Sequence, residues 1–294
     1  MSKGRGAPPR IAVIGGSGLY AMEGLADVRE TRVKTPFGPP SDAVVLADLG
    51  GVRCAFLPRH GRGHTLLPGE VNSRANIWAL KSLGVERIVS VSACGSLREE
   101  LAPRDFVFPD QLVDETKRRD ATFFGGGIVA HVAFARPFCA DLSALAASES
   151  RGLGIRSREG GTYVCMEGPA FSTRAESEMH RQLGYSIIGM TAIGEAKLAR
   201  EAELCYATVA MVTDFDCWKE DDEVDAHKVV GHLRANVANA QRLLAALLPK
   251  AVALPRTCPC KDALAAAIFT QRAAMRPATA RKLDLLIGKY ARPR

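Results

Sequence analysis

Short apolar runs alternate along this chain with segments whose apolar residues recur at helical spacing. The apolar runs are typical of buried strands, and the longer segments of amphipathic helices. Strands are predicted at Ile11–Ile14, Ala43–Leu49, Arg53–Leu57, Arg87–Ala93, Phe106–Val113, Thr162–Met166, Ser186–Met190 and Leu204–Val212. Helices are predicted at Pro68–Leu83, Phe138–Ser148, Thr173–Leu183, Ile193–Ala202, His227–Leu248, Lys261–Phe269 and Ala280–Leu286.

This alternation predicts an α/β fold in which helices cover both faces of a twisted, mixed but mostly parallel sheet, a three-layer αβα sandwich. Gly50-Gly51 splits two strands that are expected to form a hairpin. With no long linker or internal repeat, residues 1–294 are expected to form one domain. Residues 1–9 are expected to be flexible, and residues 255–294 to form a helical extension.

Composition narrows the possible partners. The 294 residues are 47% hydrophobic and 24% charged, which is ordinary for a globular protein. The formal charge of +7 is spread along the chain, and aromatic residues make up only 6%, so nucleic acid is not an expected partner. Neither a membrane-spanning apolar run nor a signal peptide is evident, so we expect no membrane association and a cytoplasmic location.

The eight cysteines are scattered, and several lie in apolar runs, which favours buried, reduced thiols. Cys258-Pro259-Cys260 is the exception, since such a pair could bind a metal or close a strained disulfide. No second pair follows at the spacing of a zinc site, so no metal is predicted.

Gly15-Gly16-Ser17-Gly18 follows the first strand. Glycines let backbone N–H groups close on an anion, and Ser17 adds a hydroxyl donor. The same residues could form a simple turn. They also fit the dinucleotide pattern G-x-G-x-x-A, but that reading requires a regular helix next, and Gly24 interrupts the segment.

Two further strands are followed by groups that could bind an anion. Arg59-His60 stands between a strand and Gly61, where arginine can hydrogen-bond an oxyanion and histidine can donate beside it. Ser92-Ala93 offers a hydroxyl and a backbone N–H, although alone it is unremarkable. Because open α/β sheets bind ligands at the carboxyl ends of their strands, these groups are expected to converge on one phosphate-sized anion.

Asp214 and Asp216 follow the most apolar strand, Leu204–Val212. Such residues can simply cap the next helix. The functional interpretation is that they bind a purine leaving group, on which negative charge grows as its C–N bond breaks. A protonated aspartic acid can donate to N7, and a carboxylate can accept from an exocyclic N6 amine and so favour adenine.

Together these segments resemble the methylthioadenosine phosphorylase branch of the purine nucleoside phosphorylase family. The match spans roughly residues 10–250, through many uncommon motifs in the same order. Those motifs are IGGSGLY (Ile14–Tyr20), LPRHGRGH (Leu57–His64), NSRANIWALKSLG (Asn72–Gly84), SACGSLREE (Ser92–Glu100), MEGPAFSTRAES (Met166–Ser177), GMTAIGEAKLAREA (Gly189–Ala202) and TDFDCW (Thr213–Trp218).

The resemblance implies a phosphorylase/hydrolase-like fold and a role for each matching residue. The phosphate would be held by Ser17, Arg59, His60, Ser92, Ala93 and Thr191. The nucleoside would contact Phe171, Met190, Asp214, Phe215 and Asp216, with Asp214 as the catalytic acid at N7. The apolar 5′ pocket would include Val229, Val230, Ala226 and, from a neighbouring subunit, His131, which without the family match would be read as a packed structural residue.

The implied reaction is phosphorolysis of 5′-methylthioadenosine to adenine and 5-methylthioribose 1-phosphate in purine and methionine salvage. Phosphate would be a co-substrate, with no metal or organic cofactor, and the borrowed histidine implies a homotrimer or a dimer of trimers. Alternatives are a broader adenosine or 6-oxopurine phosphorylase, an NAD-dependent oxidoreductase and a non-catalytic nucleoside-binding protein. Ala226 replaces a bulkier apolar residue of the family, and the segment before Val229 is one residue shorter, which leaves the size of the 5′ pocket open.

Overall fold

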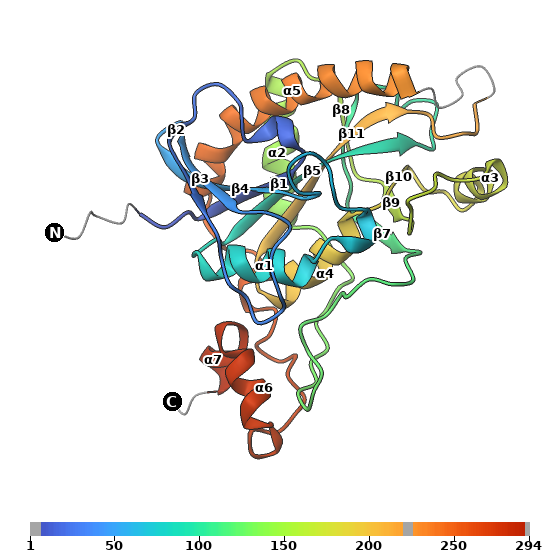
Figure 1. The fold of residues 1–294 in the computed structure, drawn as a ribbon. Helices are drawn as coiled ribbons and strands as arrows, with labels where there is room; N and C mark the ends of the chain where they lie inside the picture. The colour runs from blue at the N-terminus through green and yellow to red at the C-terminus, as the bar shows by residue number, and fades with distance from the viewer. Residues whose placement is uncertain (1–6, 220–225, 292–294) are drawn as a thin grey trace.

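The computed structural model describes residues 7–219 and 226–291, which form three layers with a sheet in the middle (Figure 1). The strands are β1 (Ile11–Gly15), β2 (Ala26–Thr31), β3 (Val44–Leu49), β4 (Val52–Pro58), β5 (Arg87–Ser96), β6 (Phe106–Phe108), β7 (Gln111–Asp114), β8 (Ser157–Glu159), β9 (Thr162–Cys165), β10 (Ile187–Gly189) and β11 (Cys205–Asp214). The helices are α1 (Ser73–Ser82), α2 (Ala140–Gly152), α3 (Arg174–Gln182), α4 (Ala192–Glu201), α5 (Ala226–Ala253), α6 (Pro277–Lys282) and α7 (Asp284–Ala291).

Strand β5 lies at the centre of the sheet. It pairs in parallel with β1 on one side and with β11 on the other. Beyond β1 come β4, β3 and β2, and the predicted hairpin of β3 and β4 is present. The far end of β5 pairs antiparallel with β10, so the sheet divides there. The carboxyl ends of β1, β4, β5 and β11 consequently meet at one edge, where open α/β sheets bind their ligands.

Side chains of successive strand residues face opposite helical layers. In β1, Ile11 and Val13 belong to an apolar cluster that includes α2 and α5. Ala12 and Ile14 belong to a second cluster that includes α1 and α4. Since both faces of the strand are covered, it is apolar at every position, which explains the continuous runs in the sequence. The predicted three-layer α/β fold is confirmed.

Two predicted elements are divided in the structure. The segment Phe106–Val113 forms two strands, because Pro109 has no N–H for a ladder and the pairing partners change there, from β11 and β8 for β6 to β9 for β7. Helix α1 begins later than predicted. A 3₁₀ turn at Pro68–Glu70 precedes it, and Asn72 caps it by accepting from Ala75 N at 3.1 Å.

The C-terminal segment lies beneath the sandwich, beside the loop between β7 and α2 (Figure 1). The helix predicted at Lys261–Phe269 is wrong. A 3₁₀ turn spans Pro259–Asp262, and Ile268 then forms a β-bridge with Ala130. The helix predicted at Ala280–Leu286 corresponds to the end of α6 and the first three residues of α7. Of the segment expected to be flexible, residues 1–6 lie outside the described residues, and Pro9 is buried.

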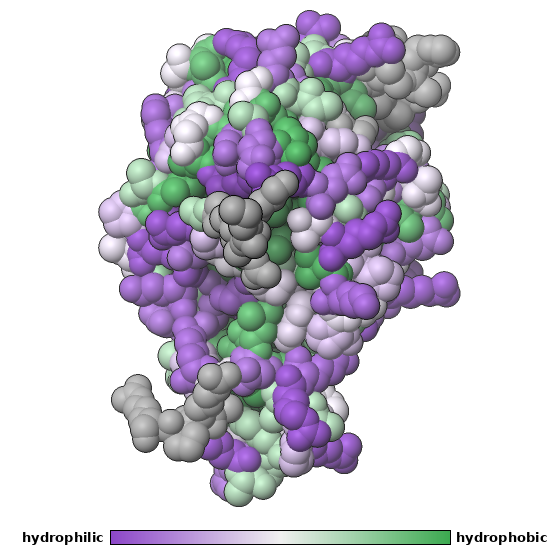
Figure 2. Space-filling view, turned by 60° about the vertical axis from the view of Figure 1, so that its left-hand side comes forward, coloured by the Kyte–Doolittle hydropathy of each residue, from purple (hydrophilic) through white to green (hydrophobic). Residues whose placement is uncertain are grey.

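Polar side chains are spread over the whole visible face in the space-filling view, with smaller apolar areas between them (Figure 2). None of the helices in the described part of the chain combines the length and apolar character that crossing a bilayer requires.

Candidate active site

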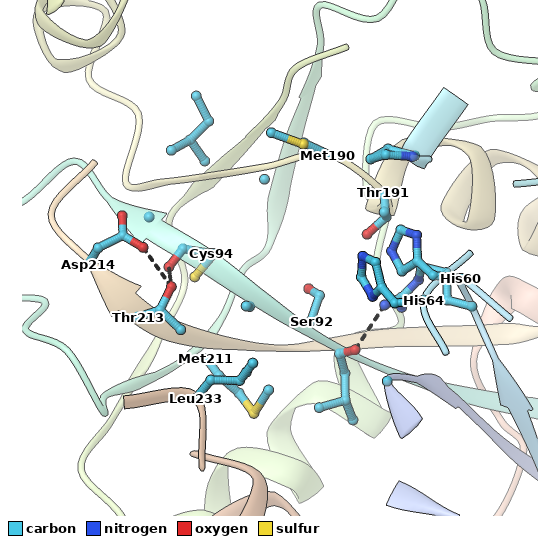
Figure 3. Close-up of a pocket in the computed structure, with 18 of the residues that line it drawn as sticks. His60, His64, Ser92, Cys94, Met190, Thr191, Met211, Thr213, Asp214 and Leu233 are labelled. Carbon is cyan, nitrogen blue, oxygen red and sulfur yellow. Dashed lines mark hydrogen bonds between the residues drawn. The ribbon is translucent and has the colours of Figure 1, made fainter. Parts of the chain in front are cut away.

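A cavity of about 410 Å³ opens where the central strands end. It is lined from several elements by residues far apart in the sequence (Figure 3). The lining comprises Gly16, Gly18, Leu19, Arg59, His60, His64, Pro68, Val91, Ser92, Ala93, Cys94, Gly95, Met166, Phe171, Ile188, Gly189, Met190, Thr191, Met211, Thr213, Asp214, Asp216, Leu233 and Val237. The strand ends singled out in the sequence therefore do converge on one space.

One end of the cavity gathers hydrogen-bond donors. Ser92 Oγ is buried and has no hydrogen-bond partner among the described residues, so its hydroxyl is available to a ligand. Thr191 precedes the first turn of α4, and its side chain makes no capping hydrogen bond. Both lie near His60 and His64 (Figure 3). A helix N-terminus and open hydroxyls together suit a phosphate-sized anion.

Arg59 lines this end of the cavity, but most of its donors are already used. Its Nε donates to Glu195 Oε1 at 2.5 Å, and its Nη2 lies 3.3 Å from Glu195 Oε2. Nη2 also donates to Ser90 Oγ at 2.7 Å, and Nη1 donates to the Val91 carbonyl at 3.0 Å. The side chains of Arg59 and Glu195 are only 3% and 1% exposed. Burial alone would lower the pKa of Arg59, but the Glu195 carboxylate outweighs it and raises that pKa.

The charge of Arg59 is therefore largely balanced inside the protein. Glu195 accepts further hydrogen bonds from Tyr206 Oη at 2.9 Å and Ser90 Oγ at 2.9 Å. The contact from Nη1 to Val91 accounts for one of its two hydrogens, which leaves one that can face an anion. Arg59 thus serves first as a fixed part of the cavity wall and supplies at most one direct donor.

The surroundings of His60 favour the neutral form of its imidazole. Its Nδ1 lies 2.9 Å from the Leu66 carbonyl, which can only accept, so Nδ1 carries the hydrogen. Burial lowers the pKa of His60 below its ordinary 6.5, and the nearby Arg59 charge lowers it further. The ring stacks on His64 at 4.5 Å between centroids. An anion placed against Nε2 would favour the protonated ring, which couples anion binding to proton uptake.

The opposite end of the cavity carries Asp214 and Thr213 (Figure 3). Asp214 Oδ1 accepts from the Asp216 backbone N at 2.9 Å, and Oδ2 accepts from Thr213 Oγ1 at 2.7 Å. Thr213 Oγ1 is also 3.2 Å from the Cys94 carbonyl. The Thr213 hydroxyl has one hydrogen and two neighbouring acceptors, the Asp214 carboxylate and the Cys94 carbonyl. It can donate to the carboxylate, or it can donate to Cys94 and accept a hydrogen bond from a protonated Asp214. Either protonation state of Asp214 is accommodated.

Asp216 differs from Asp214 in its hydrogen bonding. The residue is 4% exposed, and its Oδ2 has no hydrogen-bond partner within the described part of the chain. A buried carboxylate oxygen without a donor is costly, so a ligand that supplies an N–H would be favoured there. Gly95 makes room for both acids, since a Cβ on it would stand 3.0 Å from Asp214 Oδ1 and 3.3 Å from Asp216 Cβ.

Between the two ends the wall is mainly apolar. Met190 lies on one side of the cavity, and Met211 and Leu233 on the other (Figure 3). Met190 Sδ would be 2.6 Å from a Cβ at Gly168, whose φ of +68° also favours glycine, so a glycine there lets Met190 approach. Phe171 lies on the rim and is 66% exposed. Flat or apolar parts of a ligand fit this middle section.

Some residues named from the sequence are not in this cavity. Phe215 packs instead against Trp218, with ring centroids 5.6 Å apart, in a separate apolar cluster. Phe215 therefore lies in that cluster, while the two aspartates that flank it line the cavity. His131 is exposed on its own chain and contacts Phe269 at 5.2 Å between ring centroids. The side chains of Ser17, Ala226, Val229 and Val230 lie outside those that the structure describes.

The sequence reasoning missed several wall residues. Leu233 and Val237 stand four residues apart on α5, a helical spacing that continues the predicted pocket by one and two turns. Cys94 directly follows the Ser92-Ala93 pair, and burial together with the Asp214 charge raises the pKa of its thiol well above 9.0. The role of Glu195 could not be predicted from the neighbouring sequence, because its partner Arg59 is 136 residues away.

Comparison with known proteins gives a consistent picture. A family model described as the phosphorylase superfamily matches residues 10–249. An S-methyl-5′-thioadenosine phosphorylase of Geobacter sulfurreducens is 55% identical over 282 residues, which cover 95% of this chain and 98% of that protein. One of Koribacter versatilis is 56% identical over 284 residues, covering 95% of this chain and 96% of that protein.

Solved structures agree in fold over most of the chain. A methylthioadenosine phosphorylase sourced from an Antarctic soil metagenomic library superposes with a TM-score of 0.92 at 48% identity, covering 95% of this chain and 99% of that one. A methylthioadenosine phosphorylase from Schistosoma mansoni in complex with adenine gives a TM-score of 0.83 at 37% identity, covering 88% and 98%.

Proposed function

This chain belongs to the phosphorylase superfamily, and we propose that it uses inorganic phosphate to cleave 5′-methylthioadenosine into adenine and 5-methylthioribose 1-phosphate. The relatives named above are methylthioadenosine phosphorylases. The observation that carries the adenine part is the buried Asp216 Oδ2, which lacks a donor among the residues described. An exocyclic N6 amine supplies that donor, whereas a 6-oxo group would bring a second acceptor.

In the proposed arrangement the purine lies at the Asp214 end of the cavity and the phosphate at the Ser92 end. Ser92, Thr191, His60 and the remaining Arg59 hydrogen hold the phosphate, with Ser17 and the Ala93 backbone beside them. The ribose lies between them, against Met190, and Phe171 covers the base from the rim. The phosphate then faces C1′ from the side opposite the base.

The chemistry follows from that arrangement. As the C1′–N9 bond lengthens, positive charge grows on the ribose and negative charge on the purine, as in glycoside cleavage generally. The phosphate stabilises the first charge and then bonds to C1′. Asp214 neutralises the second by donating its proton to N7, while Thr213 turns its hydroxyl to the carboxylate that remains. Positioning and electrostatics supply the acceleration, so we assign the reaction no metal or organic cofactor.

We further propose that the working enzyme is a homotrimer or a dimer of trimers in the cytoplasm, serving purine and methionine salvage. His131 points to an oligomer because it is exposed on its own chain beside Phe269, which is 68% exposed, and Val129, which is 47% exposed. This apolar surface suits a subunit interface, across which His131 would complete the neighbour's 5′ pocket with Ala226, Val229 and Val230.

The decisive experiment compares turnover with and without phosphate on methylthioadenosine, adenosine, methylthioinosine and inosine. The expected result is phosphate-dependent release of adenine, fastest from methylthioadenosine. Equal rates without phosphate would refute phosphorolysis, and adenosine turned over as well as methylthioadenosine would refute the methylthio preference. Oligomers assembled from Asp214→Asn and His131→Ala chains should be more active than either variant alone if subunits share sites, and no gain in activity would contradict the shared pocket.

A further inference from the structure

Four of the eight cysteines come together far from the cavity. Cys139 precedes α2, Cys205 begins β11, and Cys258 and Cys260 flank Pro259 in the C-terminal segment. All four Sγ atoms lie within 4.8 Å of one another. Three of these residues are buried and Cys258 is half-buried. We call this group the cysteine cluster.

Packing alone does not account for the cysteine cluster. A buried cysteine usually behaves as a small apolar side chain, as Cys54 does in the middle of β4. Here four sulfurs from three distant parts of the chain converge on one point. Their spacing is close to that of a metal tetrahedron, since Zn–S bonds of about 2.3 Å place sulfurs about 3.8 Å apart. The Cys205 and Cys258 sulfurs are 3.4 Å apart, well beyond the roughly 2.0 Å of a disulfide.

The backbone around the cysteine cluster is already fixed by hydrogen bonds. Cys139 N donates to the Tyr206 carbonyl at 2.8 Å, which ties it beside Cys205 on β11. Cys205 N donates to the Glu86 carbonyl at 3.0 Å. Two of the four ligands are therefore held in place by the sheet before any metal binds, which lowers the conformational cost of closing the site.

A cation stands beside the cysteine cluster. The Arg256 side chain donates to the carbonyl of Glu203, two residues before Cys205. Four thiolates around a divalent metal carry a net charge of about −2, which a neighbouring guanidinium partly balances. The other neighbours are apolar residues of the cluster that includes α2 and α5. Such a dry, four-thiolate site has no open position for a substrate.

We propose that the cysteine cluster binds a structural Zn²⁺ ion that fastens the C-terminal segment to the sandwich. Each thiol gives up its proton to solvent as its sulfur bonds to the metal, so no oxidant or reductant is needed. The site takes no part in phosphorolysis, because Cys205 and Asp214 lie at opposite ends of β11, about 30 Å apart. The sequence predicted no metal because the other two ligands, Cys139 and Cys205, are single cysteines far apart in the chain and do not form a second closely spaced pair.

The site would also support the loop that carries His131. Beyond Cys260, the C-terminal segment pairs with that loop. Ile268 forms a β-bridge with Ala130, and His131 N donates to the Ala267 carbonyl at 2.8 Å. A metal at the cysteine cluster would thus anchor the segment on which this loop rests.

The test is metal content of the full-length protein, purified under reducing conditions after growth with added zinc. The test variant is Cys258→Ser/Cys260→Ser, and the matched control is Cys54→Ser, which changes a buried thiol outside the cysteine cluster. The wild type and the control are expected to carry about one zinc per chain, and the double variant roughly tenfold less or lower still. No stoichiometric zinc in the wild type, or equal zinc in the double variant, would overturn the proposal.

A second measurement does not depend on the variant folding. Wild-type protein stripped of metal and loaded with Co²⁺ should show the intense visible bands and near-ultraviolet charge-transfer band of tetrahedral thiolate coordination. A spectrum typical of oxygen or nitrogen ligands would overturn the proposal. So would an intact mass showing that these four cysteines form disulfides in the reduced preparation. Neither readout depends on nucleoside cleavage, so failure here leaves the proposed reaction untouched.

Discussion

Replacing Asp216 with asparagine changes a single buried oxygen at the base end of the cavity. The residue has a φ of +52°, a left-handed conformation that asparagine tolerates better than most residues. The substitution therefore keeps the backbone and nearly the same shape. What it removes is the negative charge on Oδ2, the oxygen that we assign to the N6 amine.

The size of the effect follows from the burial of that oxygen. With Asp216 only 4% exposed, water cannot replace a lost partner. A hydrogen bond to a charged group contributes about 1.5–3 kcal/mol, so kcat/KM for methylthioadenosine should fall about tenfold to a hundredfold. The new amide can donate to a 6-oxo group, so kcat/KM for methylthioinosine should fall less or rise. The ratio of the two values should shift by at least about tenfold toward methylthioinosine.

The assay is initial-rate release of each base at saturating phosphate, with melting temperatures recorded to confirm that the variant folds. The decisive quantity is the ratio of the two kcat/KM values, because a general loss of active protein cancels in it. An unchanged ratio would refute the assignment of Asp216 to the N6 position, even if both rates fell.

Three other substitutions test the rest of the site. Asp214→Asn should lower kcat by about 10²-fold on adenine and hypoxanthine nucleosides alike, because both bases have N7, and unequal losses in steady-state assays would place Asp214 elsewhere. Arg59→Met should lower the free energy of unfolding, measured by urea titration, by about 3–5 kcal/mol, because it leaves the Glu195 charge without its cationic partner. The double variant Arg59→Met/Glu195→Gln should recover most of that stability. Equal losses in the single and the double variant would argue against a coupled pair. The pKa of His60 is lowered in the fold, so its contribution to stability is present above about pH 6.5 and is lost as the pH falls toward the folded value. His60→Asn should therefore lose less melting temperature than the wild type on acidification without phosphate, and identical pH profiles would contradict a neutral buried His60.

The order of elements and the places where strands end could be predicted from the sequence. Continuous apolar runs predicted buried strands, and the polar or glycine residues that follow them marked the cavity edge at Arg59, Ser92 and Asp214. Errors occurred where local patterns were weak. The segment Lys261–Phe269 has helical spacing, but it forms the end of a 3₁₀ turn and further turns, and Ile268 then pairs with Ala130.

The chemistry of the site was only partly readable in advance. The groups that stand at the strand ends could be located from local patterns alone, because their position depends on short-range alternation and turn residues. The packing of distant elements brought Glu195 to Arg59, across 136 residues, where it accepts two of the arginine's hydrogen bonds and balances its charge. It likewise brought Cys139 and Cys205 to the Cys258–Cys260 pair. Partners so distant along the chain leave no periodic trace, because their proximity depends on strand order and on which face of the sheet each side chain occupies.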